Sequence, residues 1–126
     1  TENKSCNGNA SFFLEPLEAT SLALVDKINR WTFDVINKNI NIKKANSLYK
    51  KYVKEIEVVI GLHYLNPAHS SDFWDIAKDN SQFVYEHEEF NNILLNLNND
   101  NYFVNDFGTW TKESFKQNIE GLSLNL

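Results

Sequence analysis

Three histidines are the side chains best suited to metal or acid–base chemistry in this 126-residue chain. They are His63, His69 and His87, and neutral imidazole binds zinc or iron in proteins. Their spacing matches neither the His-Glu-x-x-His pattern of zinc proteases nor the Glu-x-x-His pattern of di-iron bundles. The sequence therefore predicts no metal site. A small metal-binding or hydrolytic enzyme that pairs these histidines with nearby carboxylates stays the alternative.

Nucleotide and thiol chemistry have less support. Phosphate-binding loops place glycines close together, whereas the four glycines of this chain lie at positions 8, 61, 108 and 121. Cys6, the single cysteine, falls in a polar N-terminal stretch away from a base that would activate its thiol. We therefore expect no catalytic residue and no cofactor, and we interpret the chain as a protein that is not an enzyme.

The strongest pattern is the separation of charge along the chain. Residues 1–65 carry a net charge of +2, whereas residues 66–126 carry −7. In the second part, Asp72, Asp75 and Asp79 recur at helical spacing and so share one face, where like charges repel. Folding gains little from this repulsion, so the pattern favours an acidic surface that meets a positively charged macromolecule. A solvated face without a specific partner is the alternative.

Large aromatic side chains accompany these acids and would supply anchoring area at such an interface. The predicted partner-binding residues combine both kinds: Asp72, Trp74, Asp75, Asp79, Tyr85, Glu86, Glu89, Tyr102 and Trp110. For each aromatic taken alone, packing in the core is the alternative.

A smaller basic patch precedes the acidic part of the chain. It contains Tyr49 and Tyr52 among lysines at positions 43, 44, 50, 51 and 54. Because the patch has no arginine for bidentate phosphate contacts and the chain as a whole is acidic, nucleic acid is not the expected partner. An acidic rim, including that of a second copy, is another ligand for these lysines, and the oligomeric state is left open.

Apolar residues recur every three or four positions, which predicts a mainly α fold: a single compact bundle of about four to five helices. The first helix is expected over 16–38, with Leu24, Ile28 and Trp31 on its buried stripe. The second runs from Ile42 to the stop at Asn66-Pro67. A short strand near 56–62 is the alternative there, because that piece is rich in β-branched residues.

Three shorter helices are expected in the second half of the chain. The first of them turns Phe73, Ile76 and Ala77 inward. The second begins at a Ser81 cap and ends before the polar run 98–101, and the third begins at a Thr111 cap. An irregular aromatic segment is expected between the last two.

The ends of the chain and its compartment follow from composition. Residues 1–10 have almost no apolar content and are expected to form a flexible N-terminus before a single helical domain over 11–126.

The longest apolar stretch, Val58 to Leu62, is far shorter than a membrane-spanning helix, so no membrane partner is expected. Because the single cysteine cannot form an internal disulfide, a reducing compartment is favoured, and we expect a cytoplasmic protein.

The chain resembles bacterial toxin-immunity proteins, including those of contact-dependent growth inhibition systems. The resemblance lies in small size, in an acidic, aromatic-rich and asparagine-rich composition, and in the acidic residues Asp72, Asp75, Asp79, Glu86, Glu88 and Glu89. It implies an antitoxin that inhibits a cognate basic toxin, such as a nuclease, by covering its active site. Carboxylates would imitate the phosphates that a nuclease attracts, and aromatic groups would slow dissociation.

Overall fold

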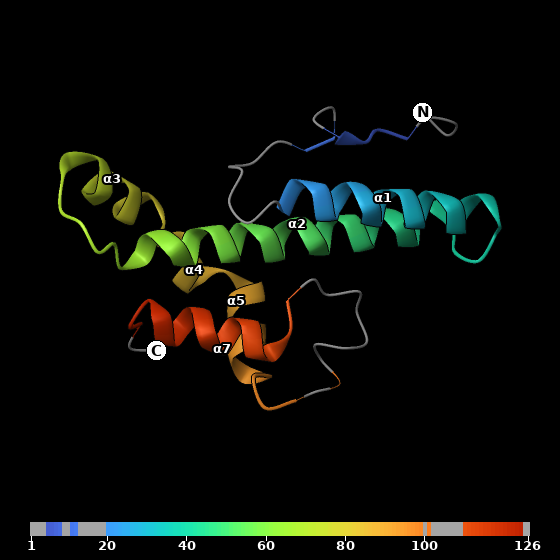
Figure 1. Cartoon of the computed structure of the whole chain (residues 1–126). Helices are drawn as coiled ribbons and strands as arrows, with labels where there is room; N and C mark the ends of the chain where they lie inside the picture. Colours follow the sequence, from blue (N-terminus) through green and yellow to red (C-terminus); the bar gives the residue numbers. More distant parts are fainter. Residues whose placement is uncertain (1–4, 9–10, 13–19, 100, 102–109, 125–126) are drawn as a thin grey trace. The chain divides into compact units, whose positions relative to one another are not determined.

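The computed structural model describes residues 5–8, 11–12, 20–99, 101 and 110–124. The chain divides into two compact units, Thr1–Val53 (unit 1) and Lys54–Leu126 (unit 2). In chain order the helices are α1 (Thr20–Ile36), α2 (Ile42–Leu65), α3 (Asp72–Asn80), α4 (Phe83–Glu86), α5 (Glu88–Leu95) and α7 (Lys112–Gly121) (Figure 1). Regular structure in these described ranges is helical throughout, which confirms the mainly α prediction. The expected division into a flexible N-terminus and one domain over 11–126 stays a prediction.

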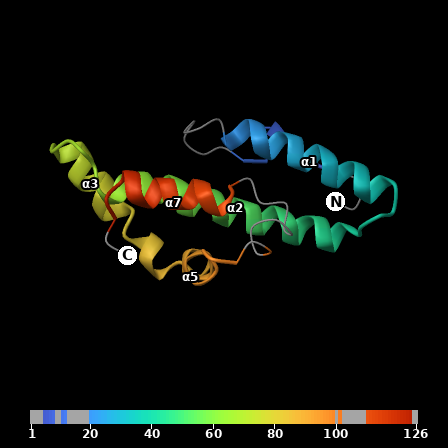
Figure 2. The same cartoon turned by 60° about the horizontal axis from the view of Figure 1, so that its bottom comes forward.

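Unit 1 is built on α1 and the first half of α2, which lie side by side (Figures 1 and 2). Leu24, Ile28 and Trp31 are all buried, as the predicted stripe of α1 requires. The ring of Trp31 meets the ring of Tyr52 edge to face, with the two centroids 6.2 Å apart. α1 ends at Ile36, slightly before the predicted end, and residues 16–19 lie outside the described ranges.

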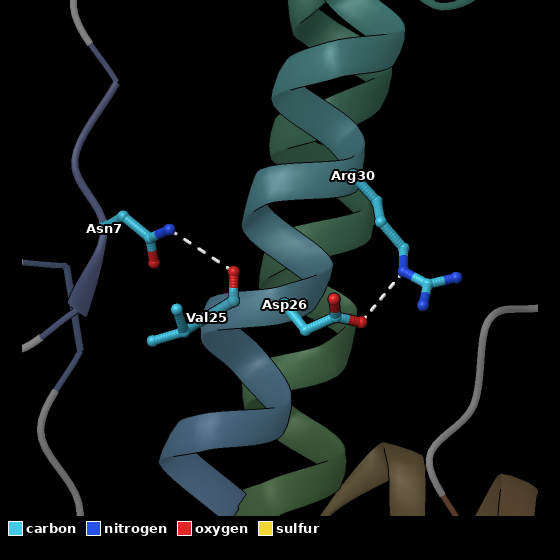
Figure 3. Close-up of polar contacts among 4 residues, drawn as sticks. All are labelled: Asn7, Val25, Asp26 and Arg30. Atoms are coloured by element: carbon cyan, nitrogen blue, oxygen red, sulfur yellow. Dashed lines mark hydrogen bonds and ion pairs between the residues drawn. The ribbon is translucent and has the colours of Figure 1, made fainter.

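An asparagine ties the N-terminal segment to α1. Asn7 Nδ2 donates to the carbonyl oxygen of Val25 at 3.3 Å, a bond drawn in Figure 3, and to Asn29 Oδ1 at 2.7 Å. On the same helix, Arg30 Nε donates to Asp26 Oδ2 at 2.8 Å. Both charged side chains are exposed, so their pair contributes only about 0.3–0.5 kcal/mol.

Tyr49 makes the stability of unit 1 sensitive to alkaline pH. Its hydroxyl donates to the carbonyl oxygen of Ser11 at 2.7 Å. Burial, followed by the negative charge of the Cys6 thiolate, raises the pKa of Tyr49 above its ordinary value of 10.0. Because the folded pKa is raised, the stability linked to Tyr49 is fully present below about pH 10 and is lost as pH rises through the folded pKa.

Tyr49→Phe is therefore expected to lower the free energy of unfolding by about 1 kcal/mol at neutral pH, through loss of the bond to Ser11. Above about pH 10 the difference between wild type and variant should shrink, because the wild-type hydroxyl ionises and stops donating. Urea unfolding at a series of pH values measures this difference. A gap that stays constant with pH would show that the hydroxyl is not the titrating group.

Unit 2 contains the second half of α2 and is built around it. The segment 56–62 is helical, so the alternative of a short strand there is wrong. Its apolar residues repeat at helical spacing, and their burial outweighs the strand preference of valine and isoleucine. The core residues of this unit are Ile56, Val58, Val59, Leu62, Leu65, Val84, Phe90, Ile93, Trp110 and Phe115. Among the residues that the structure describes, no helix combines the length with the apolar character that a bilayer crossing requires.

The helix predicted from Ser81 is interrupted at His87. α4 ends at Glu86, and the backbone of His87 is extended, with φ −76° and ψ 123°, before α5 begins. His87 Nδ1 accepts a hydrogen bond from the backbone N–H of Glu89 at 3.3 Å and so caps α5. The three-and-four spacing of apolar residues continues through His87, so the sequence predicts one unbroken helix. Such spacing does not show where a polar side chain caps a new helix.

α3 directs Phe73 and Ile76 outward, so the inward orientation predicted for these two residues is wrong, whereas Ala77 is half-buried. These two side chains are 63% and 61% exposed. Trp74 makes the contact to α2 instead, with its ring centroid 5.9 Å from that of Tyr64. At 3.6 residues per turn, Ile76 falls between Phe73 and the acidic residues of α3, so apolar and acidic groups share the exposed face.

Candidate functional site

Gly61 lets α4 pack directly on α2. A Cβ atom at this position would overlap the side chain of Val84 and would lie 3.3 Å from the ring of Phe83. Val84 is fully buried, whereas Phe83 stays exposed. Glu57 lies one helical turn before Gly61 on the same face of α2. Because glycine has no side chain, α4 can approach α2 closely at Gly61. This approach brings the junction of α4 and α5 close to Glu57.

Glu57 and His87 face each other beside this contact. The distance between Glu57 Oε2 and His87 Nε2 is 3.7 Å. The histidine side chain is 17% exposed and the glutamate side chain 42%, so the pair opens to solvent on the glutamate side. A separation of this size is too long for a direct hydrogen bond, but catalytic contacts commonly shorten once a ligand is bound.

The hydrogen bonds of His87 set its tautomer. Because Nδ1 accepts from the backbone N–H of Glu89, the proton of the neutral ring resides on Nε2, which faces Glu57. Nε2 of the neutral ring thus points its N–H toward the carboxylate across 3.7 Å. A partly exposed carboxylate is suited to accept a proton from a bound molecule.

Phe83 adds an aromatic surface to the pair. Its ring centroid lies 6.2 Å from that of His87, with the ring planes at 62°. This edge-to-face geometry is one that aromatic rings prefer, and the exposed side of Phe83 can receive a further ring in the same manner. The arrangement places a partly exposed carboxylate beside an exposed aromatic ring.

The other two histidines do not join this pair. His63 Nδ1 donates to the carbonyl oxygen of Val59 at 2.7 Å, one turn earlier on α2. His69 is exposed in the segment between α2 and α3. Among the side chains that the structure describes, no three histidine, cysteine or acidic residues gather where they could hold a metal ion. Within the alternative of an enzyme, His87 with a carboxylate is the combination that the geometry supports.

The structure separates the predicted partner-binding residues. Asp72, Asp75 and Asp79 lie together on the exposed face of α3, whereas Trp110 is buried with its ring against Phe115. The others are Trp74, half-buried on α3; Tyr85 and Glu86, exposed on α4; Glu89, half-buried on α5; and Tyr102, outside the described residues. The expected aromatic segment 102–110 also lies outside them, apart from Trp110.

Sequence reasoning missed Glu57. It stands in a long apolar helix pattern and far along the chain from His87, so no local spacing joins the two. The available signal is Gly61, because a glycine inside a strong helix pattern often marks a close approach of another element. That signal predicts tight packing, but it does not name the partner.

The family model described as tryptophan halogenase matches residues 2–125 of this chain. The match extends over both units and includes Glu57, Phe83 and His87. No curated protein and no solved structure matches the chain.

This match overturns the interpretation of the chain as a bacterial immunity protein. Small size and an acidic composition report on solubility and on association with charged partners, and unrelated domains share them. The expected role as an antitoxin, the cognate basic toxin as partner and the expectation that the chain is not an enzyme are wrong for the same reason.

Proposed function

The chain belongs to the tryptophan halogenase family, and from that premise we propose that it takes part in the halogenation of an aromatic substrate of the tryptophan type. Glu57 accepts the proton that the ring loses, His87 orients Glu57, and Phe83 docks the ring. The observation that carries this proposal is the 3.7 Å approach of His87 Nε2 to Glu57 Oε2 beside an exposed aromatic side chain.

Halogenation of an aromatic ring leaves one proton to be removed. When a ring carbon takes the halogen from a hypohalous acid that is supplied as co-reactant, the oxygen–halogen bond breaks and hydroxide leaves. The carbon at first keeps its hydrogen, and the ring becomes positively charged. A nearby carboxylate stabilises this charge and then takes the proton, while the electron pair of the C–H bond returns to the ring. Glu57 suits this step because it is partly exposed and faces the Nε2 atom of His87.

The family implies a flavin cofactor, and the described residues do not fit one. A flavin dinucleotide is held by closely spaced glycines whose amides face its phosphates where a helix follows a strand. In the part of the chain that the structure describes, Gly8, Gly61 and Gly121 lie in separate places, and regular structure includes no strand. These residues are therefore assigned no role in holding a flavin.

Glu57→Gln is expected to lower the rate of halogenation by about a hundredfold. The amide keeps the shape of the carboxylate but cannot accept the proton. The assay supplies the full chain with tryptophan and hypobromite as the electrophilic bromine, and detects bromotryptophan formed above the rate in buffer alone by mass spectrometry.

Glu113→Gln is the matched control, because Glu113 is an exposed glutamate on α7 and the substitution changes the net charge equally. This variant should keep the wild-type rate. Equal rates in both variants would remove Glu57 from the reaction. A wild-type chain that forms bromotryptophan no faster than buffer alone would overturn the proposed function itself.

The cytoplasm is the proposed compartment. Cys6 carries an exposed free thiol. Free thiols persist where glutathione and thioredoxin keep proteins reduced. Labelling of Cys6 with a thiol-specific reagent in intact cells tests the assignment. A cytoplasmic protein should have a reduced, reactive thiol at Cys6.

A further inference from the structure

Each unit carries an exposed surface on which charged and apolar side chains lie together. In unit 2 this is the acidic α3 surface, made of Asp72, Phe73, Asp75, Ile76 and Asp79. α3 has no buried residue, and the side chains of Phe73 and Ile76 stay in solvent although burial would stabilise apolar groups of this size. Its aspartates also repel one another at their three- and four-residue spacing. Both features favour a basic and apolar partner.

In unit 1 the corresponding surface is the turn from α1 to α2 with the adjoining helix ends. This basic tip consists of Phe33, Ile36, Lys38, Ile42, Lys43 and Lys44, all exposed. Its lysines complement the aspartates of α3 in charge, and its apolar side chains are of the same kind as those of α3. The two surfaces are therefore complementary.

Hydrogen bonds hold the basic tip in one conformation. Lys38 has left-handed backbone, with φ 60°, and the N–H of Asn39 donates to the carbonyl oxygen of Asp34 at 2.9 Å. The side-chain amide of Asn39 donates to the Asp34 carboxylate at 3.0 Å. Asn41 Oδ1 accepts from the N–H of Lys44 at 2.8 Å and caps α2. A surface that is already ordered loses little conformational entropy when it binds.

We propose that the acidic α3 surface of one copy of this chain binds the basic tip of a second copy. Two α3 surfaces would repel each other, as would two tips, so the contact joins unlike surfaces in a head-to-tail manner. Lysines opposite aspartates speed the encounter and fix the orientation, while the exposed apolar side chains of both surfaces become buried. The contact is independent of the proposed halogenation, which uses neither surface.

Charge reversal in the full chain tests this contact. The α3 variant carries Asp72→Lys, Asp75→Lys and Asp79→Lys. The tip variant carries Lys38→Glu, Lys43→Glu and Lys44→Glu. The matched control carries Glu86→Lys, Glu113→Lys and Glu120→Lys, at exposed acids outside both surfaces. Sedimentation velocity at micromolar to millimolar protein concentrations measures association at low and high salt, and circular dichroism checks that each variant is folded.

The wild-type chain should associate at low salt and dissociate as salt rises, because the charge pairs are screened. The α3 variant and the tip variant, each alone, should have an association constant at least about tenfold lower than that of wild type. The control should match wild type. Mixing the two variants should restore association, because one keeps a native tip and the other a native α3 surface. A wild-type chain that stays monomeric, reversals that change nothing, or a mixture no stronger than its components would each overturn the proposal.

Discussion

Phe90→Ala is expected to lower the free energy of unfolding of unit 2 by about 3–5 kcal/mol. Phe90 is 1% exposed, and its ring meets that of Tyr85 edge to face with the centroids 6.3 Å apart. Truncation removes the buried ring and leaves a cavity, which close-packed neighbours fill only in part. Urea unfolding followed by circular dichroism measures the loss.

Phe73→Ala is the matched control for this change. It removes the same side chain from an exposed position on α3, so stability should change by no more than about 0.5 kcal/mol. If Phe90→Ala were as stable as Phe73→Ala, α5 would not close the core of unit 2.

Gly61→Val is expected to lower both stability and activity. The branched side chain would overlap Val84, so α4 must move away from α2, at a cost of about 1–3 kcal/mol. Because His87 directly follows α4, the same movement draws its Nε2 away from Glu57 and should reduce halogenation about a hundredfold. Urea unfolding and the bromotryptophan assay measure the two effects.

Gly121→Ala provides the comparison, because a Cβ atom at Gly121 meets nothing within 4 Å. Alanine forms helix more readily than glycine, so this variant should equal or exceed wild-type stability by up to about 1 kcal/mol and keep full activity. The role assigned to Gly61 would fail if Gly61→Val behaved like Gly121→Ala in both assays.

Helix ends were predictable where a stop or a cap acts through nearby backbone. Asn66-Pro67 predicts the end of α2, which lies at Leu65. Thr111 predicts the start of α7, and its hydroxyl oxygen accepts from the N–H of Ser114 at 3.2 Å. These signals depend on a few neighbouring residues, so they hold without knowledge of how the helices pack.

The candidate site was not predictable, because it depends on contacts between distant segments. The periodicity of α3 marks Phe73 and Ile76 as apolar, but whether another element covers them is decided by tertiary packing. Likewise, the approach of His87 to Glu57 follows from the packing of α4 on Gly61 and not from any spacing within one helix. The charge pattern led to the wrong class of protein, because charge does not specify chemistry.

The cap that His87 provides for α5 depends on a ring nitrogen, Nδ1, that carries no proton. A proton on Nδ1 would turn this atom from an acceptor into a donor and would break its hydrogen bond with the amide of Glu89. The start of α5 and the tautomer that points Nε2 at Glu57 therefore rest on the same hydrogen bond.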